Sequence, residues 1–138
     1  MKRKLSVVIA AAGLLLALVA PMWAHHAFDA EFDRNKPIKL QGTVKKVEWI
    51  NPHSWITIEV KKPDGTAETW EIESGPPNAM LRRGLNKNTL TVGTAVVVQG
   101  HLAVDSTRKR ANGGSITFTD GRSIFLAGSN PADPANKR

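Results

Sequence analysis

One long predicted strand, residues 38–50, constrains the fold more than any other part of the chain. The apolar residues of its first half (38–44) are even-numbered, whereas the next two, Val47 and Trp49, are odd-numbered. Because successive side chains of a strand point to opposite faces, the apolar face can change only where an extra residue is inserted. We therefore predict a β-bulge near residues 45–46 and a strand that bends, as a small closed barrel requires.

The rest of the chain predicts an all-β domain with one short helix. Turn signals separate alternating apolar segments, which indicate a helix at 78–83 and strands at 54–61, 67–73, 95–102, 115–119 and 122–126. Loops are expected at the basic residues 108–110 and at Asn112-Gly113-Gly114. This order fits a small OB-fold-like barrel of five to six strands, which is a Greek-key barrel. A β-sandwich, or a meander with a stray helical turn, is the alternative.

The N-terminus has the three parts of a secretory signal peptide. A basic start (residues 2–4) precedes an apolar run (5–20), and Ala24 supplies the small residue before a cut. An uncleaved anchor is the alternative, although the run is short against the roughly 20 residues of a spanning helix. We predict a periplasmic or secreted protein without a membrane span after cleavage. Its parts are a signal peptide (1–24), an N-terminal arm (25–37), the barrel domain (38–127) and a disordered tail (128–138).

Composition excludes several classes of function. Removing the three basic residues of the predicted signal peptide lowers the formal net charge from +7 to +4, and this charge is too small for a nucleic-acid face without clustering. The chain has no Cys, which excludes thiol chemistry and cysteine metal sites, so the hydrophobic core alone must hold the domain. We expect a monomer whose partner is an unknown small ligand or an envelope protein.

No pattern of an enzyme active site is present. The chain has no Tyr and no nucleophile-elbow, P-loop or HExxH motif. Ser54 follows His53 directly, and adjacent strand residues face opposite sides, so the two make a poor nucleophile and base pair. We predict that the protein is not an enzyme.

Histidine is the residue type that could carry chemistry. In an OB-fold, the loop after the first strand and the loop after the fourth lie by one binding face, so His53 and His101 could converge. If the signal peptide is cut after Ala24, the free amine and imidazole of His25, with His26, could add ligands. Such nitrogens suit copper or zinc. We predict a transition-metal site formed by His25, His26, His53 and His101; the alternative is solvated turn histidines and a chance His pair.

Aromatic residues give a second hypothesis for the same turn. Trp49 and Trp55 bracket Asn51-Pro52-His53, and an exposed Trp there could stack a sugar or a base. Trp49, Asn51, His53 and Trp55 would then bind a glycan, peptide or oligonucleotide. The alternatives are Trp side chains that close the end of the barrel, and a structural envelope protein that binds other proteins.

Several short motifs along the chain resemble one family. They are His-His-Ala-Phe at 25–28, Glu31-Phe32-Asp33, Gly42-Thr43-Val44, Val47-Glu48-Trp49 with Asn51-Pro52-His53, Trp70-Glu71, and Leu81-Arg82-Arg83-Gly84 followed by a Val-rich strand. These resemble the DUF6152 family of small exported bacterial proteins of uncharacterised function. The resemblance implies a secreted or periplasmic protein. It brings no activity and no assigned ligand residues, so the metal hypothesis comes from the residues alone.

Overall fold

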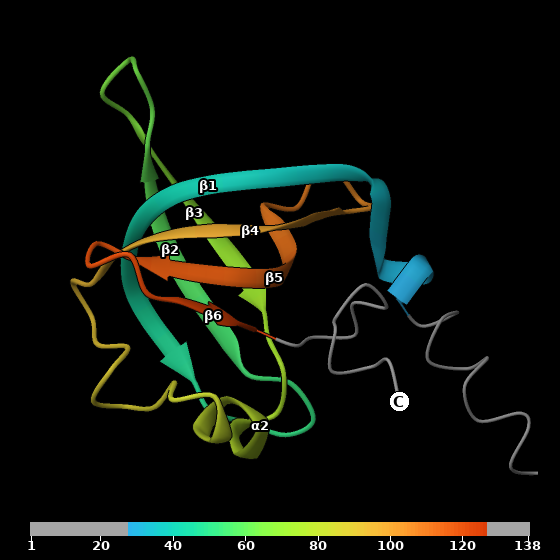
Figure 1. Ribbon diagram of the computed structural model, residues 1–138. Helices are drawn as coiled ribbons and strands as arrows, with labels where there is room; N and C mark the ends of the chain where they lie inside the picture. Colours follow the sequence, from blue (N-terminus) through green and yellow to red (C-terminus); the bar gives the residue numbers. More distant parts are fainter. Residues whose placement is uncertain (1–27, 127–138) are drawn as a thin grey trace, which may run out of the picture.

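A computed structural model describes residues 28–126, which form a β-barrel with one short helix (Figure 1). The elements are β1 (Phe32–Glu48), β2 (Trp55–Lys61), β3 (Ala67–Glu73), α2 (Pro77–Arg82), β4 (Ala95–Ala103), β5 (Arg110–Phe118) and β6 (Ser123–Phe125). Residues 28–31 add a helical turn before β1. The predicted signal peptide, the start of the predicted arm and the predicted tail lie outside the described residues.

Five strands close the barrel, and the predicted OB-fold-like arrangement is confirmed. The ring runs β1-β2-β3-β5-β4 and returns to β1. Only the β3–β5 contact is parallel, and it joins Glu71–Glu73 to Arg110–Asn112. Beyond it, β6 pairs with residues 115–117 of β5. The helix α2 lies at one end of the barrel, between β3 and β4 in the chain (Figure 1).

The predicted β-bulge lies where the sequence placed it. The pairing of β1 with β2 shifts its register between Val44 and Lys46, so Lys45 is the extra residue. Val44 is fully buried before the bulge, and Val47 and Trp49 pack against the same core after it. The phase change in the sequence therefore reports a real bend in β1.

Two boundaries differ from the sequence prediction by more than two residues. β1 begins at Phe32, six residues before the expected Ile38, because Phe32 and Pro37 already pair with Ala103 and His101 of β4. β5 begins at Arg110, so the loop predicted at Asn112-Gly113-Gly114 is wrong. Gly113 serves close packing there, since a Cβ on it would lie 2.8 Å from Ile72 and 2.5 Å from Leu126.

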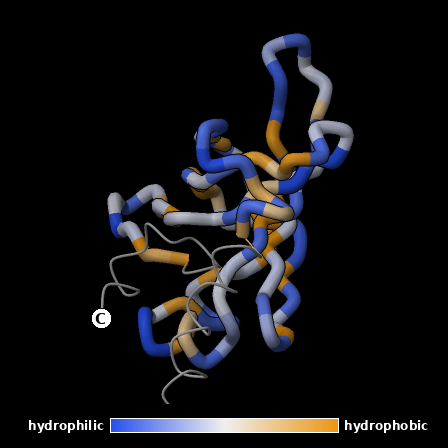
Figure 2. The backbone as a smooth tube through the Cα atoms, turned by 90° about the vertical axis from the view of Figure 1, so that its right-hand side faces the viewer, coloured by the Kyte–Doolittle hydropathy of each residue, from blue (hydrophilic) through white to orange (hydrophobic). Residues whose placement is uncertain are grey.

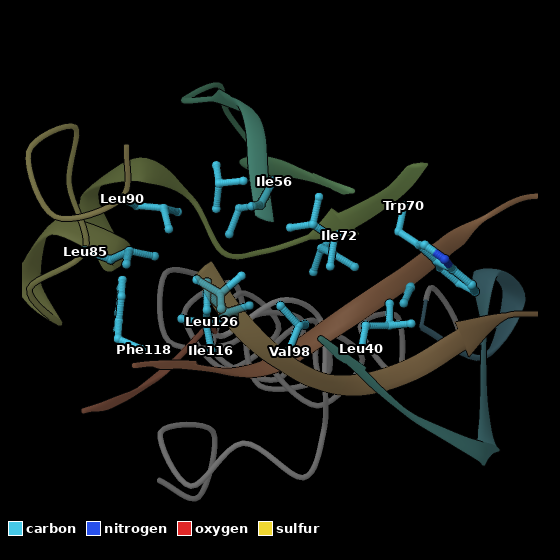
Figure 3. Close-up of a cluster of buried hydrophobic side chains, with 14 of the residues drawn as sticks. Leu40, Ile56, Trp70, Ile72, Leu85, Leu90, Val98, Ile116, Phe118 and Leu126 are labelled. Carbon is cyan, nitrogen blue, oxygen red and sulfur yellow. The ribbon is translucent and has the colours of Figure 1, made fainter. Parts of the chain in front are cut away.

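The core fills the inside of the barrel. Figure 3 shows apolar side chains from opposite walls pointing toward one another. They come from every strand of the ring and from the segment after α2, and include Leu40, Ile56, Ile72, Leu85, Val98 and Ile116. The β2–β3 hairpin extends beyond this core, and its tip is hydrophilic (Figure 2). The buried apolar surface of the ring supplies the main stabilisation, as expected for a domain without disulfides.

Helices contribute little to the described part of the chain. Proline at its N-terminus suits the start of α2, and Gly84, with φ +87°, ends the turn after it. The predicted helix at 78–83 is thus confirmed to within one residue. No helix among residues 28–126 is both long enough and apolar enough to cross a membrane.

The paired strands β4 and β5 should be the part of the barrel most sensitive to added side-chain volume. A Cβ on Gly100 would lie 1.8 Å from the carbonyl oxygen of Asn112, so Gly100→Ala must displace backbone. We expect a loss of more than about 2 kcal/mol in the free energy of unfolding, measured by urea denaturation. Gln99→Ala changes an exposed neighbour and should stay within about 0.5 kcal/mol. Equal losses in the two variants would contradict this account.

Candidate functional site

His53 is held by a buried carboxylate. The turn after β1 brings His53 beside the end of β3, where its Nδ1 lies 2.6 Å from Oε1 of Glu73. The Glu73 side chain is 1 % exposed and the imidazole 37 % exposed. This contact engages one ring nitrogen and leaves Nε2 for another partner. A carboxylate that engages one nitrogen of an imidazole fixes the orientation of the ring.

Three strands carry polar residues in one line across the outside of the barrel. Glu73 on β3 is the register partner of Asn112 on β5, and Asn112 is the partner of His101 on β4. Ile72, Ala111 and Gly113 face the core, so the alternating residues Glu73 and Asn112 lie on the outer face. We call Glu73, Asn112, His101 and the attached His53 the polar row.

The spacing within the polar row follows from the strands. Neighbouring strands lie about 4.8 Å apart, so the Cα atoms of Glu73 and His101 are separated by about 10 Å. His53 joins the polar row only through its contact with Glu73, and the two imidazoles that the sequence analysis expected to converge do not touch each other. Glu73 and Asn112 lie between them.

Asn112 and His101 carry buried polar atoms that lack partners. The Asn112 side chain is fully buried, and neither its Oδ1 nor its Nδ2 has a hydrogen-bond partner among the described residues. The same holds for Nδ1 of His101 within residues 28–126. Each such atom costs about 1–3 kcal/mol relative to a satisfied one. These unsatisfied atoms belong to two register partners, Asn112 and His101. A group that hydrogen-bonded to them would remove this cost.

The start of the described chain packs against His101. The Phe28 ring meets the imidazole edge-on, with centroids 6.0 Å apart, and lies 5.7 Å from the Phe32 ring. Phe28, Phe32 and Ala103 form a small buried cluster on the outside of the barrel. His25 and His26, which the sequence predicts as metal ligands, lie outside the described residues.

The carboxyl group of Asp33 interacts electrostatically with His101. The pKa of the Asp33 carboxyl lies below its usual value, mainly because the backbone N–H of Asn35 donates a hydrogen bond to it. Lys36 lowers it further, and the charge of the His101 imidazole contributes a smaller part. Asp33 is the second residue of β1, so the segment that covers His101 also brings a carboxylate toward it.

The two Trp residues of the predicted binding turn have other neighbours. Trp49 packs partly against the core. The face of Trp55 is covered by the guanidinium of Arg110, 4.5 Å from the ring centroid, and Arg110 also donates to Glu71 at 2.8 Å. Asn51, which precedes a cis peptide bond to Pro52, is exposed.

Sequence reasoning missed Glu73 and Asn112. Glu73 ends a strand in the outward phase, and a charged residue there reads as solvated. Asn112 begins an Asn-Gly-Gly run that is typical of a loop. Their burial depends on the parallel contact between β3 and β5, which joins segments almost forty residues apart and leaves no local signal. The sequence marks this place only by a carboxylate, Glu73, directly before the Ser-Gly-Pro-Pro run that ends the strand.

The described residues alone do not complete a metal site. Within residues 28–126, no group of three or more His, Cys, Asp or Glu side chains could hold an ion. A surface hollow of about 300 Å³ lies elsewhere, lined by Gln41, Gly42, Thr43, Glu59, Lys61 and Ala95, and contains none of the predicted site residues.

Comparison with known proteins places the chain in a family. A family of unknown function, DUF6152, matches residues 12–112. The chain belongs to the DUF6152 family. The DUF6152 match includes all four predicted metal-ligating histidines and Asn112, and it stops before most of β5 and β6. No curated protein matches the chain.

The His53–Glu73 contact should contribute to stability. Removing the imidazole leaves a buried carboxylate without one of its partners, so we expect a double-mutant cycle with His53→Ala and Glu73→Ala to give a coupling of about 1 kcal/mol or more in unfolding free energy. The matched control is Lys46–Glu48, a 2.9 Å ion pair in which both side chains are exposed. It should show no measurable coupling. A coupling energy between His53 and Glu73 as small as that of the control pair would show that their contact does not contribute to stability.

Proposed function

We propose that this protein is an exported, non-enzymatic binding module that holds a transition-metal ion at the polar row. The observation that carries the proposal is the buried Glu73 carboxylate, 2.6 Å from Nδ1 of a partly exposed His53. Metal-ligating histidines usually present one nitrogen to the ion while a carboxylate or carbonyl holds the other. His53 has this arrangement, with Nε2 as the nitrogen available to an ion.

His101 supports the same site from the other end of the polar row. Its Nδ1 is buried and lacks a partner among the described residues, and Phe28 fixes the ring from the side. Lone imidazole nitrogens buried beside a polar amide are costly unless they bind something.

The N-terminal histidines would complete the ligand set. Phe28 is packed on His101, and in the sequence His26 precedes Phe28 by two residues and His25 by three. If export cleaves the chain after Ala24, the new α-amine adds another nitrogen. Several nitrogen donors without any thiolate suit Cu(II) or Zn(II).

Metal titration tests this function directly. Protein purified after export should bind Cu(II) or Zn(II) with a Kd below about 10 μM by calorimetry, which corresponds to about −7 kcal/mol. His53→Ala and His101→Ala should each weaken binding at least about tenfold. Glu73→Gln should also weaken it about tenfold, because it loosens a ligand's orientation. The matched control is Glu71→Gln, an exposed carboxylate on the same strand and face, which should change the Kd less than about threefold.

Two results would end the proposal. One is the absence of binding tighter than about 10 μM for either ion. The other is binding that His53→Ala and His101→Ala leave unchanged, because an ion held elsewhere would not involve the polar row. Equal effects of Glu73→Gln and Glu71→Gln would contradict the role of the buried carboxylate while leaving the ion in place.

Export and processing have their own measurement. Intact-mass analysis of the secreted protein should give the mass of residues 25–138, with His25 first, and under native conditions one added metal ion. A mass that retains residues 1–24 would contradict cleavage and remove the α-amine from the ligand set. A mature chain that starts at another residue would do the same, while His53 and His101 could still be tested by titration.

A further inference from the structure

We propose that the edge of β1 facing away from β4, from Pro37 to Gln41, binds an extended acidic peptide of a partner protein. We call this the docking edge. The peptide would add a strand to the barrel, and one of its acidic side chains would enter the hollow lined by Gln41, Thr43 and Lys61. This inference does not depend on the proposed metal binding and concerns a different part of the barrel.

The docking edge lacks a neighbouring strand. Residues 37–43 pair with β4 along one edge of β1. Along the other edge, pairing with β2 begins only at Thr43 and Glu59, and the β2–β3 hairpin diverges from β1 (Figure 1). Before Thr43, this second edge therefore has no strand partner among residues 28–126.

The alternation of backbone groups shows which residues present them at the docking edge. On the β4 side, the N–H of Val44 donates to the carbonyl of Thr94. Because successive strand residues point their N–H and C=O groups to opposite edges, those of Lys39 and Gln41 point away from β4. Pro37 presents only a carbonyl there, since proline lacks an N–H. An extended peptide would exchange backbone hydrogen bonds with these groups, as in β-strand addition.

The hollow lies where the docking edge meets β2, and its volume is about 300 Å³. On β2, the N–H of Lys62 donates to Thr66 toward β3, so the backbone groups of Lys61 point to the opposite edge, toward β1. Gln41 and Lys61 both line the hollow but are not paired with each other. The hollow is thus a pocket for a side chain of the added strand, which is how sheet edges select a peptide.

The charge around the docking edge favours an acidic occupant. The side chains of Lys39 and Lys61 are exposed and form no ion pair within residues 28–126. Glu59 also lines the hollow, but its carboxylate lies 3.5 Å from the ammonium of Lys45, which offsets its charge. A second copy of the chain would bring lysines against lysines, and lysine and proline on an edge strand disfavour such pairing.

Hydrogen exchange followed by nuclear magnetic resonance tests the docking edge. The probe is a short synthetic peptide of alternating glutamate and threonine with blocked termini, and it should bind saturably with a Kd below about 1 mM. The amide hydrogens of Lys39 and Gln41 should exchange quickly in the free protein and at least about tenfold more slowly with saturating peptide, because they then donate to it. The amide of Leu40, which pairs with Val98 of β4, should be protected in both states.

Two sets of variants separate the backbone contribution from the charge contribution. Gln41→Pro removes an N–H of the docking edge and should weaken peptide binding at least about tenfold. Its control, Ser123→Pro in the edge strand β6, should change the Kd less than about threefold. Lys39→Glu combined with Lys61→Glu should weaken binding at least about tenfold through like-charge repulsion. Its control, Lys87→Glu, changes an exposed lysine in the loop after α2 and should have less than about a threefold effect.

The lysine variants keep the test decisive if Gln41→Pro fails to fold. Absence of binding tighter than about 1 mM, or a Kd that the lysine variants leave unchanged, would overturn the proposal. The same conclusion would follow from protection confined to other amides, from equal binding of a lysine–threonine peptide, or from a dimer of this chain that forms through the docking edge. Metal-free and metal-loaded protein should bind the peptide equally, so failure of either proposal leaves the other to its own test.

Discussion

The fold depends on β1 pairing with two different neighbours along its length. Its first part pairs with β4 and its second part with β2, and Thr43 is paired with both. A flat strand cannot do this in a five-stranded ring, so β1 must bend. Two local features allow the bend: the extra residue Lys45, and Gly42, where a Cβ would lie 2.6 Å from the carbonyl oxygen of Glu59. Once β1 bends, β3 and β5 are brought edge to edge, and their short parallel contact places Glu73 beside Asn112.

This dependence explains which parts of the protein could be predicted from its sequence. The bulge, the bend and the β2–β3 hairpin are encoded by neighbouring residues, through the change from even to odd apolar positions before Val47 and through the turn at residues 62–65. Glu73 and Asn112 could not be found, because their burial arises only when the ring closes. The glycines beside Asn112 were misread as a turn signal, since close packing and turns both require glycine.

The outer face of the barrel shows that this chain does satisfy polar groups where no ligand is needed. Two residues before Glu73 and Asn112, on the same face, Glu71 is the partner of Arg110. There the guanidinium donates to the carboxylate at 2.8 Å and stacks on Trp55. The next pair of positions has the same strands and the same face, but the amide of Asn112 is buried without a partner among residues 28–126. Strand geometry alone therefore does not account for the unsatisfied amide.

The energetics of the buried polar groups support the proposed bound ligand. A buried network of polar side chains stabilises a fold only when all its members are satisfied, and otherwise an apolar set of the same shape is more stable. The barrel already has a continuous apolar core on the inner face, so the polar row adds nothing that packing requires. The Phe28 ring nevertheless packs edge-on against the His101 imidazole on the outer face. In the proposed function, a ligand that contacts the His101 imidazole and the Asn112 amide would satisfy polar atoms that have no partner among residues 28–126.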